Sequence, residues 1–189
     1  MTTTSPEAGS SRFQKESKPP QNQSRHAARV LALQVLFQWD FHGTAEFWKD
    51  EFWSHQRVTS QVQGFAEQLV EGVQANRQEL DRLISQYAKN WTIDRMPVVD
   101  RTILRQALFE LIWLPDVPAK VSVNEALQLA KSFADEDTKG FVNGILDQVL
   151  KQDPRLQEKR TAISQNSGNP PKETILFTAG NQTLPTPDD

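Results

Sequence analysis

Apolar side chains recur at the spacing of helical turns through the middle of the chain, and this periodicity limits the fold more than any other sequence feature. A first helix is expected from an N-cap at Ser24. After its first turn it is apolar on nearly every side, which is typical of a helix at the centre of a bundle. Further helical segments are expected at residues 47–53, 62–73, 80–87, 98–112, 123–133 and 141–150. No stretch alternates convincingly with a period of two, and a short strand could compete only at residues 117–123. The sequence therefore predicts an all-α domain of six or seven helices joined by short loops.

Local signals mark the expected ends of these helices. Gly43 is expected to stop the first helix, and a break is expected near Asn76. Pro97 suits the first turn of a later helix, because its missing N–H needs no partner there. Ser122 and Asp137 are expected to cap the last two helices.

Proline and aromatic residues divide the chain into a domain and two tails. Eight of the eleven prolines lie in the first 23 or the last 37 residues, whereas all aromatic residues except Phe13 and Phe177 lie between them. We therefore expect one helical domain over residues 24–152. Residues 1–23 are expected to form a disordered basic N-terminal arm, and residues 153–189 a disordered C-terminal tail.

The composition excludes several classes of protein. The chain has no cysteine, and therefore no disulfide framework, thiol nucleophile, iron–sulfur cluster or cysteine zinc site. Its longest apolar run, at residues 111–114, is far shorter than a membrane span requires, and the N-terminus has no apolar signal core. We therefore expect a cytoplasmic protein without a membrane segment.

No motif predicts catalysis, a cofactor or a metal site. Phosphate-binding glycine loops and the serine nucleophile elbow are absent from the sequence, and the three histidines match no local metal-ligand spacing. The acidic run that begins at Asp135 fails as a calcium loop, because Lys139 and Leu146 occupy positions that need oxygen ligands. Capping of the following helix is the better interpretation of these carboxylates.

Charge is distributed unevenly along the chain. Residues 1–39 carry a net charge of +3, residues 40–150 carry −6, and residues 151–189 are neutral. A net-acidic body with a basic entry segment indicates a local anion-binding face. Charge alone leaves open that this short segment is positive by chance.

The basic first turn of the first helix is the strongest candidate for chemistry. Arg25 and Arg29 lie four residues apart and so share one helix face, with His26 beside them. With Lys18 of the arm, these guanidinium groups could straddle neighbouring phosphates of a nucleic-acid strand. Single-stranded RNA is favoured over duplex DNA, because flexible basic arms with exposed aromatic rings typically capture unstacked bases.

Several motifs in order then resemble one known family. They are RHAAR at 25–29, ALQVLFQ at 32–38, VDRTILR at 99–105, FEL at 109–111, VP at 117–118, NEA at 124–126, LAK at 129–131 and FVNGILD at 141–147. Over residues 25–150 the chain resembles the NusB family of transcription antitermination factors. The resemblance implies a NusB-like antitermination fold of two small packed helical bundles and no catalysis.

The same resemblance implies partners. Proteins of this family bind the boxA element of nascent RNA together with the ribosomal protein NusE, and the pair joins RNA polymerase and supports ribosomal RNA transcription. The acidic surface of residues 40–150 is a reasonable docking face for a basic ribosomal protein. Whether the free protein forms a homodimer is left open.

The resemblance also implies the RNA-binding residues. The arginine-rich motif of the family falls on Arg25, His26 and Arg29, and Lys18 adds charge from the arm. A second RNA-contacting region of the family falls on Lys139 and Phe141, before and within the last helix. At both places the chain departs from the family pattern. Alanines replace further arginines, and glycine replaces the lysine that often stands directly before the phenylalanine.

Polar residues within the apolar helices have a structural interpretation. Hydrogen bonds between helices are expected for Asn124, Glu125, Asn143 and Asp147, because a buried amide or carboxylate must be paired. A salt-bridge network is expected for Arg101 and Arg105, with the nearby acidic residues Asp94, Asp100 and Glu110.

Two other functions stay open. The first is a ribosomal RNA cytosine methyltransferase whose N-terminal domain resembles NusB. Such an enzyme needs a further nucleotide-cofactor domain, whereas a 37-residue tail follows the helical domain here. The second is a helical scaffold or homodimer that does not bind RNA.

Overall fold

The fold is helical throughout the part of the chain that the structure describes. The computed structural model describes residues 21–43, 51–89, 91–159 and 161. Its elements are α1 (Gln21–His42), α3 (Ser60–Ala75), α4 (Arg77–Tyr87), η1 (Ile93–Arg95), α5 (Val98–Trp113), α6 (Ala119–Phe133), α7 (Glu136–Gln152) and η2 (Pro154–Leu156), where η marks a 3₁₀ helix. The all-α prediction is confirmed, and the chain forms no strand at residues 117–123. Lys18 and most of the expected arm and tail lie outside the described residues.

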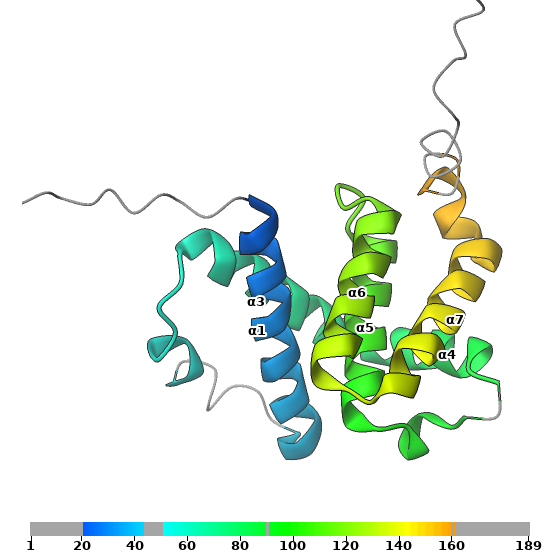
Figure 1. Cartoon of the computed structure of the whole chain (residues 1–189), viewed down its shortest axis with the longest axis horizontal. Coiled ribbons are helices and arrows are strands. Elements are labelled where there is room, and N and C mark those ends of the chain that lie inside the picture. Colours follow the sequence, from blue (N-terminus) through cyan, green and yellow to red (C-terminus); the bar gives the residue numbers. More distant parts are fainter. Residues whose placement is uncertain (1–20, 44–50, 90, 160, 162–189) are drawn as a thin grey trace, which may run out of the picture.

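The helices form two packed groups that share α5 (Figure 1). Helices α1 and α3 pack against each other on one side, and α4, α6 and α7 surround α5 on the other. Helix α5 also contacts α1 and α3, so it joins the two groups. Every residue from 102 to 111 is buried, which makes α5 the central helix instead of α1. Helix α1 keeps an exposed strip, which includes Gln34, Gln38 and Phe41.

Some of the predicted helix ends are confirmed, and others are shifted. Gly43 ends α1 with φ +71°, a left-handed conformation that favours glycine, and Asn76 separates α3 from α4. Pro97 is the N-cap of α5 and therefore precedes the first turn. The predicted N-caps at Ser24, Ser122 and Asp137 are wrong, because each of these residues lies inside its helix.

Helices α6 and α7 both begin earlier than predicted. Pro118 is the N-cap of α6, and a proline is compatible with the start of a helix. Ser122 therefore lies inside α6, where it is buried. Asp135 is the N-cap of α7, so Asp137 falls within its first turn.

The packed structure continues beyond the expected boundary at residue 152. Asp153 is buried and accepts a hydrogen bond from the backbone N–H of Arg155, which starts η2. Leu156 is 1% exposed and joins the core. The Lys159 ammonium donates to the backbone carbonyls of residues 110 and 114 at the end of α5. The residues just after 152 are therefore part of the domain and not of a tail.

Candidate nucleic-acid interface

The N-terminal end of α1 places Arg25 at the surface beside an aromatic ring. Its guanidinium lies 4.9 Å from the ring centroid of Phe65 on α3, in cation–π geometry. The Arg25 Nη2 also lies 3.5 Å from the Asp116 carboxylate in the loop before α6. Both side chains of this ion pair are exposed, so the pair is weak and solvent-screened. Arg25 is thus oriented by protein contacts and still open to an anion from solvent.

His26 is held by an acid on another helix. Its Nδ1 lies 2.7 Å from the Glu125 Oε2 of α6, and about a third of the histidine side chain is exposed. This contact confirms the predicted interhelix role of Glu125. The other three predicted interhelix residues are not buried, since Asn124 and Asn143 are exposed and Asp147 pairs with Lys151 along the surface of α7.

Arg29 is buried, in contrast to the exposed face expected for it. It is 1% exposed, and its Nε and Nη2 donate to the two Glu110 oxygens of α5 at 2.8 and 2.7 Å. Its Nη1 lies 3.7 Å from Glu125, and the guanidinium lies over the Phe65 ring at 5.3 Å. A phosphate in solvent cannot reach this side chain. Arg29 therefore ties α1 to α5 and α6. The four-residue spacing did not predict its burial, because residues of α3, α5 and α6 all cover its part of α1.

The second predicted region lies at the start of α7. Lys139 is exposed, and Phe141 is half-buried with its ring centroid 5.7 Å from that of Trp91. The Thr138 hydroxyl donates to the buried Asp100 carboxylate of α5 at 3.1 Å, which fixes the first turn of α7. Burial raises the pKa of Asp100, and the Thr138 hydrogen bond opposes that effect.

The two regions lie at opposite ends of the helices (Figure 1). The N-terminal end of α1 adjoins the start of α6, whereas Phe141 follows the turn from α6 to α7. Helix α6 has 15 residues, and a helix of that length spans about 22 Å. A nucleic-acid strand that contacts both regions must run along the molecule.

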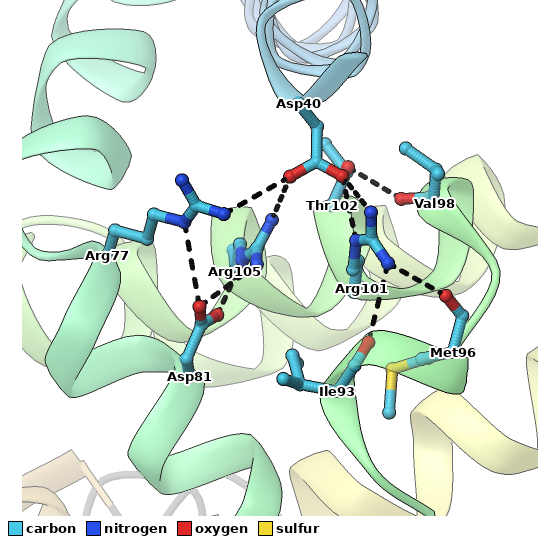
Figure 2. Close-up of polar contacts among 9 residues, drawn as sticks. All are labelled: Asp40, Arg77, Asp81, Ile93, Met96, Val98, Arg101, Thr102 and Arg105. Atoms are coloured by element: carbon cyan, nitrogen blue, oxygen red, sulfur yellow. Dashed lines mark hydrogen bonds and ion pairs between the residues drawn. The ribbon is translucent and has the colours of Figure 1, made fainter. Parts of the chain in front are cut away.

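A charged network joins the two helix groups at the C-terminal end of α1 (Figure 2). The buried Asp40 carboxylate of α1 accepts hydrogen bonds from Arg101 and Arg105 of α5. Arg105 also binds Asp81 of α4 at 2.6 Å, and Arg77 bridges the same two acids at 3.8 and 3.7 Å. The predicted network of the two α5 arginines is therefore confirmed.

The acids of this network are not the predicted ones. Asp94 is exposed, Asp100 binds Thr138, and Glu110 binds Arg29. Burial acts to raise the pKa of Asp40, but hydrogen bonds and charge from the two arginines outweigh it and hold that pKa below its ordinary value. The network therefore has a structural role, and its two α5 arginines are largely covered, with Arg101 18% and Arg105 3% exposed.

An apolar groove follows the exposed strip of α1. It has a volume of about 390 Å³ and is lined by Leu33, Gln34, Phe37, Gln38, Val99 and Phe133. Phe41 lies next to Phe37, with a ring-centroid distance of 5.1 Å, and is 64% exposed. Exposed apolar patches of this kind mark protein–protein contact sites.

The histidine, aspartate and glutamate side chains of the described residues form no group of three or more that could hold a metal ion. Among the same residues, no helix is both long enough and apolar enough to cross a membrane.

Fold and site together define a class of small helical proteins, in which two helix groups share a central helix and a cationic helix end lies at the surface. The chain belongs to the NusB family, because the model of that family matches residues 26–151.

Individual relatives agree with this assignment. The chain is 45% identical to the Transcription antitermination protein NusB of Symbiobacterium thermophilum over 137 residues, which cover 68% of this chain and 90% of the relative. It is also 45% identical to the protein of the same name from Myxococcus xanthus over 132 residues, which cover 67% and 94%.

Solved structures show the same fold. NusB of T. maritima superposes with a TM-score of 0.65 at 32% identity, covering 72% of this chain and 96% of that chain. A crystal structure of the antitermination factors NusB and NusE in complex with dsRNA contains a chain that superposes with a TM-score of 0.62 at 30% identity. It covers 68% of this chain and 97% of that chain.

Proposed function

We propose that the chain is a transcription antitermination factor that binds boxA-type RNA together with NusE and supports ribosomal RNA transcription by RNA polymerase. It acts by binding and not by catalysis, in the cytoplasm. Family membership, the names of the relatives and the solved NusB–NusE–dsRNA complex support this proposal. The observation that carries it is the cationic N-terminal end of α1, where Arg25 and His26 are accessible beside the Phe65 ring.

The predicted RNA-binding residues take different roles in this proposal. Arg25 and His26 contact phosphate, and Lys18 adds charge from the arm. Arg29 is a positioning residue, because its pair with Glu110 holds the N-terminal part of α1 against α5. Lys139 and Phe141 form a separate contact region at the other end of α6.

Replacing the Asp116 carboxylate by a phosphate at Arg25 costs little free energy. Its pair with Asp116 is exposed, and such pairs contribute about 0–1 kcal/mol. A phosphate offers the same guanidinium two oxygens in a bidentate geometry and releases counterions from the RNA. The Phe65 ring keeps the guanidinium in place during this exchange.

NusE occupies the apolar groove of α1, α5 and α6 in this proposal. The groove and Phe41 expose aromatic surface on an acidic body, which suits a basic ribosomal protein with an apolar contact patch. The groove lies away from the N-terminal end of α1, so RNA and NusE can bind at the same time.

A second copy of this chain is the competing occupant of the groove. Phe41→Ser distinguishes the two occupants when both complexes are measured, since it weakens only the complex that uses the groove.

The RNA site is tested by Arg25→Ala in a titration of labelled boxA-type RNA at several salt concentrations. We expect a loss of about 1–3 kcal/mol in binding free energy and a salt slope that falls by about 1. Arg82→Ala is the matched control, because it removes an exposed arginine from α4. Unchanged affinity of Arg25→Ala at matched salt overturns the assignment of the site.

The alternatives give different results in size-exclusion chromatography with NusE and boxA RNA. A complex that contains one copy of each component supports antitermination, whereas a dimer that ignores RNA supports the scaffold. The methyltransferase alternative is not favoured, since the relatives at 45% identity carry the antitermination name.

A further inference from the structure

Trp91 is exposed although it belongs to the largest apolar residue type. It lies between α4 and η1, and 47% of its surface is open to solvent. Its indole contacts the ring of Phe141 on α7, with centroids 5.7 Å apart and ring planes inclined at 55°. The contact joins two segments that are 50 residues apart in the sequence, and it leaves a large part of the indole uncovered.

Both rings are held in place by the backbone and by buried contacts. The Trp91 N–H donates to the carbonyl of Ala88 at 3.2 Å, which closes a turn after α4. Phe141 follows the turn of α7 that the Thr138–Asp100 hydrogen bond fixes to α5. An aromatic surface that is fixed before binding loses little conformational entropy when a ligand stacks on it.

Each ring has an exposed lysine two residues before it. These are Lys89 and Lys139, and neither makes an ion pair with another described residue. The exposed carboxylates Asp94 and Asp135 lie in the same two segments, so this region is not a strongly cationic face. A ligand that binds here gains more from the ring faces than from charge.

We propose that Trp91, together with Phe141, is a stacking subsite for an unpaired base of the bound RNA, and that Lys89 and Lys139 contact the flanking phosphates. The inference rests on the proposed function and adds Trp91 and Lys89 to the RNA-contacting surface. Proteins that bind single strands combine such aromatic rings with nearby cations, and stacking tolerates any base because every base has a π face.

The competing interpretation is structural: Trp91 merely covers Phe141 and the end of α7. Two substitutions distinguish these roles. Trp91→Leu keeps an apolar cover and removes the ring, whereas Trp91→Phe keeps a ring on which a base can stack. We expect Trp91→Leu to weaken binding of single-stranded boxA-type RNA about 5-fold or more, and Trp91→Phe to bind as the wild type does.

Salt dependence separates stacking from charge. Loss of the Trp91 ring should leave the slope of log affinity against log salt unchanged, because no phosphate contact is removed. Lys139→Gln should reduce that slope by about 1. An RNA truncated so that it reaches only the N-terminal end of α1 should be insensitive to the Trp91 substitutions, since the two regions are about 22 Å apart along α6.

A photochemical experiment on the unmodified chain covers the case in which Trp91→Leu fails to fold. RNA that carries 5-iodouridine is irradiated with the full chain, and the cross-linked peptide is identified by mass spectrometry. Cross-linking at Trp91 supports the subsite. Cross-links confined to Phe141 or to the N-terminal end of α1 overturn it, as does wild-type affinity of a folded Trp91→Leu variant.

The two proposals fail in different ways. If Arg25→Ala weakens binding and Trp91→Leu does not, the stacking subsite is wrong and the proposed function stands. If the wild-type chain binds no boxA-type RNA with or without NusE, the proposed function fails first.

Discussion

Arg29 and Glu110 form a two-point ion pair between helices whose paired residues are 81 positions apart. Both side chains are 2% exposed, and both oxygens of the carboxylate accept from the guanidinium. Taking two charges out of water is costly, so such a pair adds little net stability compared with apolar residues. Removal of one partner is different, because it leaves the other charge buried without compensation.

Glu110→Gln should therefore destabilise the fold by about 3–5 kcal/mol. The glutamine keeps the shape of the side chain and removes the closer of the two carboxylates beside Arg29, which leaves only Glu125 at 3.7 Å. The measurement is the free energy of unfolding in urea. The control is Asp147→Asn, which breaks an exposed pair with Lys151 on α7 and should cost at most about 1 kcal/mol. Equal effects of the two variants would show that Arg29 is not buried as described.

The lowered pKa of Asp40 predicts that the stability of the fold depends on pH. Its pKa in the folded chain is lowered, because hydrogen bonds and charge from Arg101 and Arg105 outweigh burial. A carboxyl with a lowered folded pKa contributes stability above its unfolded pKa, near 4, and this stability is lost as pH falls through the folded pKa. Asp40→Asn should therefore flatten the fall in unfolding free energy below about pH 4, as measured by urea unfolding at a series of pH values.

The raised pKa of Asp100 predicts the opposite change in the slope of unfolding free energy against pH. Burial raises its folded pKa, so its contribution to stability is present at low pH and is lost as pH rises through the folded pKa. Removing that contribution in Asp100→Asn should make stability rise more steeply with pH above about 4. Slopes that change in the same direction for Asp40→Asn and Asp100→Asn would contradict the two assigned environments.

Features that depend on local sequence were predictable, and features that depend on distant partners were not. Gly43 ends α1 and Asn76 separates α3 from α4 because the backbone at these positions decides the geometry. The partner of Arg101, in contrast, is Asp40, 61 residues away. Spacing along one helix says which side chains share a face, but not which helix covers that face, and so the burial of Arg29 was missed.

Signals for some of the missed features are present in the sequence. Glu110 lies within the apolar stretch that became the central helix, and an acid in such a place needs a buried cation. Asp153 before Pro154 is a helix-start signal, whereas proline content alone assigns this segment to the tail. Trp91 had no such signal, since its exposure follows only from how α4 and α7 pack.

Replacement by alanine should have opposite effects on stability at two glycines of α3. A Cβ at Gly72 would lie 1.9 Å from the ring of Phe109, a buried residue of α5 that stacks on Trp113. Gly72→Ala should therefore destabilise the fold by about 1–3 kcal/mol through overpacking. A Cβ at Gly64 meets nothing within 4 Å, and Gly64→Ala should stabilise α3 by about 0.5–1 kcal/mol.

Thermal unfolding of the two variants checks this pair of predictions. The midpoint should fall for Gly72→Ala and rise for Gly64→Ala. A second substitution, Phe109→Leu, should recover part of the loss in Gly72→Ala, because it removes the ring that the new methyl group meets. No recovery would mean that the loss has another cause than contact between α3 and α5.

The end of the folded domain is tested by two truncations. A chain that ends at Gln152 loses Leu156, which is 1% exposed, and the Lys159 ammonium, which donates to two carbonyls of α5. It should be less stable than the full chain by at least about 2 kcal/mol in urea unfolding, because burial of one leucine alone is worth about that much. A chain that ends at Thr161 keeps both contacts and should unfold as the full chain does. Leu156→Ala in the full chain should reproduce most of the loss, whereas equal stability of the two truncated chains would place the end of the domain at α7.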